Sequence, residues 1–220
     1  MILPKKNLKI ATILPYKENY SYKKASAASL WVSEFFKKSK YKKGNIIYGH
    51  TKYQDYLTVN YKNIVLNNIK NKFKSTTNEY ANKLSKEINN QFFDLIEIHN
   101  RPQLLFKLTN LIKNKFIFYF HNDPLTMNGS KSISSRKYLL KNCFKILFNS
   151  NWSKKRFLEG MHDKFINSEK LGVVFQSAKK QKVNLLNIKK EITFVGKLNK
   201  SKGYDIFGKA VLKILKKYPN

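Results

Sequence analysis

Residues 116–124 read Phe-Ile-Phe-Tyr-Phe-His-Asn-Asp-Pro, and residues 94–102 read Asp-Leu-Ile-Glu-Ile-His-Asn-Arg-Pro. In both stretches an apolar run of strand length passes directly into a polar tract that begins with His-Asn. Continuous apolar runs are typical of parallel strands that are covered on both faces, whereas half-exposed strands alternate apolar and polar residues. We therefore interpret Asp94–Ile98 and Phe116–Phe120 as buried parallel strands, each followed by a polar loop.

Similar short apolar runs alternate with amphipathic stretches along the rest of the chain. Further strands are predicted at Lys9–Leu14, Asn45–Tyr48, Lys145–Phe148 and Ile192–Val195, with weaker candidates at Tyr61–Leu66 and Leu171–Phe175. Helical spacing predicts helices over Ala28–Phe36, after a capping box of Thr76 and Glu79, and over Ile206–Tyr218 before Pro219. This alternation predicts an α/β fold: a Rossmann-like parallel sheet with helices on both faces, followed by the first βα unit of a second Rossmann-like domain.

The predicted domain organisation follows from the one long segment in which apolar runs and amphipathic stretches no longer alternate. Residues 1–175 are predicted to form one Rossmann-like domain, the lysine-rich residues 176–190 a linker, and residues 191–220 the start of a second domain. A single βα unit cannot bury both faces of its strand. Either this piece packs onto the first domain, or the sequence holds only part of a second domain; we favour the second interpretation.

The composition is strongly basic, with a formal net charge of +31. Of the 44 basic residues only Arg101, Arg136 and Arg156 are arginine, and the lysines are spread over the whole chain. This spread favours compositional bias over a concentrated polyanion-binding face, although phosphates, anionic membranes and nucleic acid remain candidate partners. The single cysteine, Cys143, excludes an intrachain disulfide and a cysteine-based zinc site. Without a signal peptide or an apolar run of membrane-spanning length, the sequence predicts a cytoplasmic protein.

Polar residues cluster where the predicted strands end, which is where open α/β sheets bind ligands. The clusters contain Tyr16, His50, then His99, Asn100 and Arg101, then His121, Asn122 and Asp123, and finally Ser150. For His50 we favour an ordinary turn residue. The matching positions of His99 and His121 favour function, because an imidazole can donate or accept a hydrogen bond at neutral pH.

The other informative tract is Val-Gly-Lys-Leu-Asn-Lys-Ser-Lys-Gly at residues 195–203. Gly196 and Gly203 allow close backbone approach, the following helix N-terminus favours an anion, and Lys197 and Lys202 add positive charge. The chemistry suits a diphosphate, although a lysine-rich chain also makes such loops by chance. No serine-hydrolase elbow, Walker phosphate loop, dinucleotide fingerprint or aspartate-rich metal motif is found.

Taken in order, these tracts resemble those of GT-B glycosyltransferases of family 4. The 195–203 tract is similar to the start of that family's donor domain, usually Gly-Arg-Leu-x-x-x-Lys-Gly. Lys202 matches the family lysine, and Lys197 stands where arginine is usual. The stretch 120–124 resembles the strand-end histidine near the transferred sugar, and 148–153 resembles a segment that carries a serine before a helix.

The resemblance implies a retaining hexosyltransferase that uses a nucleoside-diphosphate sugar in cell-envelope polysaccharide or lipopolysaccharide assembly. His121 would act at the transferred sugar, and Gly196, Lys197, Lys202 and Gly203 would bind the donor diphosphate without a metal or another cofactor. The acceptor would contact Tyr16, His99, Asn100, Arg101, Asn122, Asp123 and Ser150. Peripheral contact with the inner face of an anionic membrane is compatible with the charge, and no specific nucleic acid is expected.

Two departures from the family pattern qualify this expectation. The usual Gly-Gly loop after the first strand is absent, because residues 16–29 contain no glycine. The family's pair of donor-side glutamates would fall beyond Asn220, so this form is expected to lack a complete donor site and to show little or no transferase activity. The alternative is a basic α/β binding module for nucleic acid or anionic lipid without catalysis, which rests on the net charge alone.

Overall fold

The computed structural model describes residues 7–67, 75–162, 165, 168–176, 191–196 and 198–218. Contacts divide the chain into two compact units, Met1–Ala178 and Lys179–Asn220, and each is described by itself. Of the linker predicted at residues 176–190, only Gln176 lies within the described part. None of the described helices is long and apolar enough to cross a membrane.

The first unit is built on a seven-stranded sheet in the order β3-β2-β1-β4-β5-β6-β7, and every strand pair in it is parallel. The strands are β1 (Ile10–Ile13), β2 (Asn45–Gly49), β3 (Tyr61–Asn63), β4 (Leu95–His99), β5 (Phe116–Phe120), β6 (Cys143–Phe148) and β7 (Leu171–Val173). This confirms the predicted Rossmann-like α/β class. The order reverses between β1 and β4, and that switch point is where sheets of this kind leave a crevice for a ligand.

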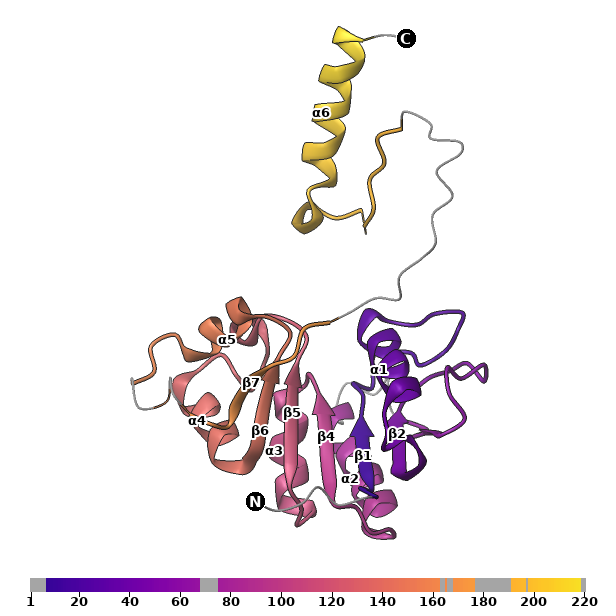
Figure 1. Cartoon of the computed structure of the whole chain (residues 1–220), viewed down its shortest axis with the longest axis vertical. Helices are drawn as coiled ribbons and strands as arrows, with labels where there is room; N and C mark the ends of the chain where they lie inside the picture. Colours follow the sequence, from indigo (N-terminus) through magenta and orange to yellow (C-terminus); the bar gives the residue numbers. More distant parts are fainter. Residues whose placement is uncertain are drawn as a thin grey trace. The chain divides into compact units, whose positions relative to one another are not determined.

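Helices cover both faces of the sheet, as predicted. They are α1 (Ala27–Lys38), α2 (Thr76–Asn89), α3 (Pro102–Leu111), α4 (Ile133–Asn142) and α5 (Asn151–Leu158), with short 3-10 turns at Lys42–Gly44 and Pro124–Thr126. Helix α1 packs its Val32 and Phe36 against Leu14 and Ile47 on one face. Helices α2 and α3 lie behind the sheet in Figure 1 and cover the opposite face.

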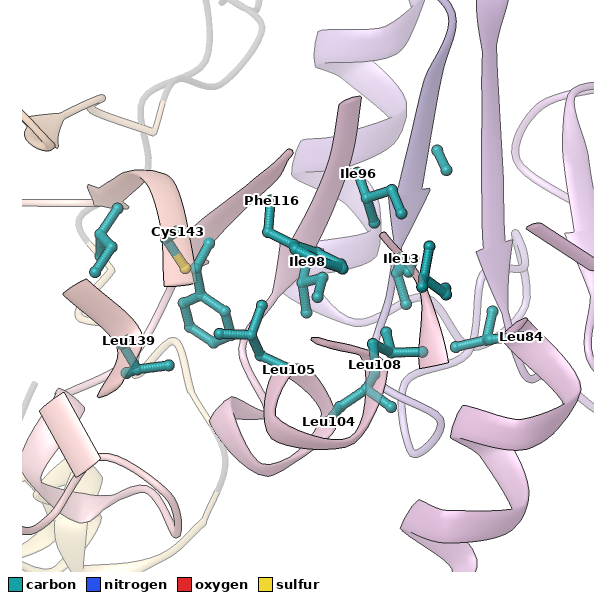
Figure 2. Packing of buried hydrophobic residues seen from close by; sticks show 14 of the residues in the cluster. Ile13, Leu84, Ile96, Ile98, Leu104, Leu105, Leu108, Phe116, Leu139 and Cys143 are labelled. Atoms are coloured by element: carbon teal, nitrogen blue, oxygen red, sulfur yellow. The ribbon is translucent and has the colours of Figure 1, made fainter. Parts of the chain in front are cut away.

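The main core lies between the sheet and helices α2, α3 and α4. Figure 2 shows Ile96 and Ile98 of β4 directed toward Leu105 and Leu108 of α3, which are all fully or almost fully buried. Burying an aliphatic side chain of this size contributes roughly 1.5–3 kcal/mol relative to leaving it in water. This layer therefore fixes β4, and with it the loop that follows at the switch point.

Successive side chains of β4 point to opposite faces of the sheet, and both faces are covered, as predicted. Ile96 and Ile98 belong to the main core, so the intervening Glu97 and the terminal His99 face the side of α1. The ring of Trp31 from α1 lies 5.8 Å from that of His99 on this side. Glu97, a carboxylate inside a strand that was predicted to be apolar, therefore lies next to His99.

Two local predictions are wrong. Helix α2 is capped by Ser75, whose hydroxyl accepts from Asn78 N, so Thr76 and Glu79 do not form the predicted capping box. Glu79 Oε1 instead accepts a 2.9 Å hydrogen bond from Asn67 N, which ties the helix to the segment after β3. The strand predicted at Ile192–Val195 is not formed, because the described residues of its unit include no second strand with which to share a ladder.

The described part of the second unit contains helix α6 (Tyr204–Lys217). Phe194 packs against Phe207 of this helix with ring centroids 5.4 Å apart. Gly203 precedes the helix at φ 72°, a left-handed conformation that glycine adopts without the clash of a Cβ atom. The predicted amphipathic helix is therefore present, shifted by two residues at its start.

Candidate functional site

The polar residues that follow β4, β5 and β6 are joined by a short chain of hydrogen bonds. Asn100 Oδ1 accepts a 2.9 Å bond from His121 N, and the His121 carbonyl accepts a 2.7 Å bond from Asn149 Nδ2. Asn100 N donates in turn to the Tyr119 carbonyl at 2.8 Å. Three strand-end loops are thereby held in one arrangement around the backbone of His121.

The turn after β4 is strained. Asn100 and Arg101 have φ values of 51° and 56°, and they are the described non-glycine residues with positive φ. Such conformations cost of order 1–3 kcal/mol each and persist only where the surroundings enforce them. Here the bonds of Asn100 to the β5 loop and the start of α3 at Pro102 enforce them. Strain of this kind concentrates at ligand-binding sites.

His99 and His121 are direct neighbours. His99 Nδ1 lies 2.7 Å from His121 Nε2, and His99 is 1% exposed. Trp31 covers the pair, with its ring 5.4 Å from the ring of His121 and 4.7 Å from that of Tyr119. On the outer side, His121 Nδ1 lies 2.5 Å from Nε2 of the exposed Gln176.

The enclosure keeps both imidazoles neutral at physiological pH. Burial, and then the charge of His121, hold the pKa of His99 well below its usual range. Burial lowers the pKa of His121 to about 4. The charged form of an imidazole is disfavoured where water is excluded, because the protein replaces only part of its hydration. The pair is therefore suited to hydrogen bonding and positioning at neutral pH rather than to binding an anion by charge.

Glu97 is a site residue that the sequence reasoning missed. Its Oε1 lies 3.6 Å from His99 Nε2, and its side chain is 18% exposed. Burial raises the pKa of Glu97 to about 7, and a weak contact from Thr12 works in the opposite direction. The signal was present in the sequence, since a carboxylate in the middle of an apolar strand is rare unless it has a partner.

A cavity of about 530 Å³ lies beside the strained turn. Three of the predicted acceptor residues line it, Asn100, Arg101 and Asn122, together with Glu18, Thr77, Pro102, Gln103, Leu104, Thr126, Met127, Asn128 and Lys131. Burial raises the pKa of Glu18, while the hydroxyl of Ser26 and the charge of Arg101 oppose the shift. The cavity therefore presents both hydrogen-bond donors and acceptors to a polar ligand.

Tyr16 contributes to this region from the end of β1. Its ring lies 5.1 Å from the guanidinium of Arg101, within cation–π range. Tyr16 also lines a second cavity of about 480 Å³, together with Lys17, Asn19, His50, Lys52, Tyr53 and Thr76. His50 Nδ1 lies 2.9 Å from the Ile64 carbonyl, a contact expected of an ordinary turn histidine.

Asp123 and Ser150 have local partners and do not line the 530 Å³ cavity. Asp123 Oδ2 pairs with Arg156 at 3.1 Å, and Asp123 Oδ1 accepts a 3.0 Å bond from Leu125 N. Ser150 caps α5 by accepting a 3.1 Å bond from Ser153 N. These contacts fix the loops after β5 and β6.

Of the predicted diphosphate-binding residues, Gly196, Lys202 and Gly203 are described and Lys197 is not. Lys202 lies in a 3-10 turn (Lys200–Lys202) that Asn199 caps, with Asn199 Oδ1 accepting a 3.1 Å bond from Lys202 N. A Cβ atom added to Gly196 would lie 3.9 Å from Lys202 Cβ. Within their own unit these three residues thus come together at the N-terminus of α6.

The described residues contain no group of three or more histidine, cysteine, aspartate or glutamate side chains arranged to hold a metal ion. Among the described residues, the neutral histidine pair, the polar cavity of about 530 Å³ and the α6 N-terminus are the features that contain the predicted site residues His99, His121, Asn100, Arg101, Asn122, Lys202 and Gly203.

No protein-family model and no curated protein matches the chain. Among solved structures, the fold is similar to that of a protein from Rickettsia africae ESF-5 whose structure is titled as a glycosyltransferase. The TM-score is 0.51 and the sequence identity 17%, and the match covers 78% of this chain and 43% of that one. The chain therefore spans less than half of that protein's length, and at this identity the likeness establishes a shared fold.

Proposed function

We propose that this chain forms the acceptor-side lobe, and the beginning of the donor-side lobe, of a glycosyltransferase with two Rossmann-like lobes. The observation that carries the proposal is the hydrogen-bonded cluster of Asn100, His121 and Asn149, which lies at strand ends beside a polar cavity of about 530 Å³. Sites of this architecture bind ligands at such strand ends. The motif resemblance and the fold likeness to the Rickettsia protein point the same way.

In this proposal the acceptor binds in the cavity through Asn100, Arg101 and Asn122. Tyr16 supports Arg101 from the end of β1. Asp123 and Ser150 serve the acceptor site indirectly, by holding the loops that carry Asn122 and Asn149. Sugars are recognised by many directed hydrogen bonds, and a cavity whose walls offer both donors and acceptors suits that task.

The donor diphosphate would bind at the N-terminus of α6. Gly196 would permit close approach, Lys197 and Lys202 would supply positive charge, and the N–H groups of the first turn of α6 would donate to an anion bound there. Stabilisation of the departing diphosphate by fixed charge would take the place of a metal ion. His121 would orient the transferred sugar, and His99 would lie behind it.

The finer proposal is a retaining, family 4 enzyme that moves a hexose from a nucleoside-diphosphate sugar to a cell-envelope glycan or lipopolysaccharide acceptor. It rests on the motif resemblance. Placement in the cytoplasm, with peripheral contact at the inner membrane face, is part of the same proposal and draws on the net charge of +31.

The test is a mass-spectrometric screen of the complete gene product, including any residues beyond Asn220, against a pool of sugar nucleotides and lipid-linked acceptors. We expect transfer from one donor, and loss of at least tenfold in activity in Lys202→Ala, since a charge-assisted hydrogen bond contributes about 1.5–3 kcal/mol. Lys200→Ala changes a lysine of the same 3-10 turn that the motif does not include, and serves as the matched control.

Salt dependence separates this proposal from the alternative of a basic binding module. Lysine–phosphate binding to RNA, DNA or anionic vesicles weakens steeply with ionic strength. Sugar-nucleotide binding at a shaped site should weaken far less. Tight, salt-sensitive binding to polyanions together with no donor turnover would replace the transferase proposal with the binding module.

A further inference from the structure

Glu97, His99 and His121 form a row of groups from the interior of β4 to the loop after β5. Glu97 Oε1 lies 3.6 Å from His99 Nε2, and His99 Nδ1 lies 2.7 Å from His121 Nε2. The row ends at Gln176, whose amide nitrogen is 2.5 Å from His121 Nδ1. Every ring nitrogen of the histidine pair therefore faces one identified group.

Proton counting leaves this pair two arrangements. A neutral imidazole carries one proton, and the contact between the two rings needs one donor and one acceptor. If His121 donates from Nε2, its Nδ1 is bare and His99 carries its proton on Nε2, toward Glu97. If His99 donates from Nδ1, the proton of His121 points outward instead, and the bare Nε2 of His99 faces Glu97. The protonation of His99 Nε2 therefore determines whether His121 Nδ1 carries a proton.

The carboxylate decides between the two arrangements. His99 Nε2 is buried and has no hydrogen-bond partner among the described residues, and the Glu97 carboxylate faces it at 3.6 Å. A lone pair directed at a carboxylate is repelled, whereas an N–H group is attracted, and the low dielectric of the site strengthens both effects. The orientation of Gln176, with its amide nitrogen toward His121 Nδ1, agrees with the first arrangement.

We propose that Glu97 and His99 are positioning residues that hold the proton of His121 on Nε2, so that Nδ1 accepts a hydrogen bond from a substrate hydroxyl group. In the structure the amide nitrogen of Gln176 takes the place of that hydroxyl as the donor to Nδ1, and because Gln176 is exposed it can yield this place to a ligand. The role of Nδ1 toward a sugar hydroxyl rests on the proposed transferase function. The proton arrangement itself does not.

The surroundings make the arrangement respond to pH through Glu97. Besides His99 on its own strand, the groups that face Glu97 are Tyr119 on β5 and the uncharged Thr12 on β1. Burial raises the pKa of Glu97 to about 7. Protonation of the carboxyl removes the attraction for the His99 N–H group, so the preference for the first arrangement weakens as the pH falls below that value.

The experiment is long-range ¹H–¹⁵N correlation spectroscopy of the histidine rings in the 220-residue chain, without ligand. Above about pH 8, where Glu97 is ionised, we expect a protonated Nε2 and a bare Nδ1 on His121. Below about pH 6, a mixture of the two arrangements should appear. In Glu97→Gln this dependence on pH should be lost, because the amide does not titrate.

Two controls test whether the changes in the NMR spectra are specific to His121 and Glu97. His50, whose Nδ1 faces the Ile64 carbonyl at 2.9 Å, should keep its proton on Nδ1 in every sample. Glu87→Gln removes an exposed carboxylate that pairs with Lys62 and should leave the His121 signals unchanged. If Glu97→Gln fails to fold, the position of the His121 proton in the unmodified chain above about pH 8 still tests the proposal.

A proton on Nδ1 of His121 above about pH 8, or an unchanged pH dependence in Glu97→Gln, would overturn the proposal. In the complete gene product, Glu97→Gln should raise the KM of the substrate that donates to His121 about tenfold, the equivalent of one hydrogen bond, with a smaller change in kcat. Absence of any sugar transfer would refute the transferase function and leave the measured proton arrangement standing.

Discussion

Asn100 Oδ1 accepts a 2.9 Å hydrogen bond from the backbone N–H of His121, across the ends of the neighbouring strands β4 and β5. The residue that makes this bond also has a φ of 51°. Asparagine is one of the few residues that adopts this conformation readily, and its short amide reaches the next loop. The strained turn and the placement of His121 are therefore one structural feature, and a substitution at Asn100 should affect both.

Replacement of Asn100 by alanine should destabilise the first unit by roughly 2–4 kcal/mol. The substitution removes the hydrogen-bond acceptor of the His121 N–H group. It also places alanine, which lacks the side-chain amide that helps asparagine tolerate this conformation, in a left-handed backbone. Asn100→Gly loses the same bond without the conformational cost, and should recover roughly 1 kcal/mol of that loss. Urea denaturation followed by tryptophan fluorescence measures both. Equal stability of the two variants would show that the backbone conformation is not strained.

The pH dependence of stability should reveal the buried carboxyl of Glu97. Burial raises its pKa from 4.5 to about 7, so the folded chain holds this proton more tightly than the unfolded chain does. The contribution of Glu97 to the free energy of unfolding is therefore greatest below about pH 4.5. It falls as the pH rises from about 4.5 to about 7, and it levels off above about pH 7. Relative to the unmodified chain, Glu97→Gln should gain roughly 3 kcal/mol of stability between these limits.

The comparison must be made as a difference between the two proteins. The pKa of His121 is lowered to about 4, so its own contribution runs the other way and is lost as the pH falls through its folded-state pKa. Subtraction of the two stability curves cancels the part of this contribution that both proteins share, and leaves the part that depends on Glu97. A difference that stays constant with pH would contradict the raised pKa of Glu97.

Removal of Trp31 should raise the pKa of His121 toward the ordinary range, because burial is the cause of its depression and the indole covers the ring at 5.4 Å. Histidine ring signals followed by NMR across a pH titration of Trp31→Ala measure the shift. Phe35→Ala is the matched control, since Phe35 stacks on Trp31 at 5.4 Å and is itself 53% exposed. We expect little change of the His121 pKa in that variant.

Cys143 should be inert toward thiol reagents in the folded protein. It is 1% exposed, and burial raises the pKa of its thiol to about 12, so that almost no thiolate is present at neutral pH. A disulfide reagent should label it only on unfolding. Ser134→Cys places a thiol at an exposed position of α4 and should react at the rate of a free thiol. Fast labelling of native Cys143 would contradict its burial.

Gly203 should be required for the start of α6. Its φ of 72° costs a residue with a Cβ atom roughly 1–2 kcal/mol, although no atom lies within 4 Å of the place where that Cβ would stand. Gly203→Ala should therefore lower helix content and diphosphate binding, whereas Gly203→Asn should retain most of both. Circular dichroism of the 220-residue chain measures the first effect. If alanine and asparagine behave alike, the left-handed start of α6 is not needed.

The strands were predictable because their signal is local. The apolar runs of β1, β2, β4, β5 and β6 each lie within a few consecutive residues, and their short length and continuous apolar character distinguish them from the amphipathic helices between them. The run at Ile192–Val195 carries the same signal but forms no strand, since a strand needs a neighbour for its ladder and the described residues of that unit provide none. Local pattern therefore predicts the capacity to form a strand, and partners decide whether it forms.

The site was predictable in its members and unpredictable in its pairings. Matching His-Asn tracts located His99 and His121 at strand ends, but nothing local indicated that their rings would lie 2.7 Å apart. Glu97 lies inside an apolar run, and its role depends on a histidine two residues later on the same face. Asp123 and Ser150, chosen by the same reasoning as Asn122, have partners that fix loops.

The amino-acid sequence alone indicated the α/β class, the approximate positions of the strands and of helices α1 and α2, and the polar residues at the strand ends, because periodicity and turn chemistry act over a few residues. The tertiary structure decided that β1 lies beside β4, that Asn100 adopts a left-handed backbone, and that Glu97, His99 and His121 form one row. These are contacts between residues far apart in the chain or across strands, and their energies depend on neighbours that a local pattern does not contain.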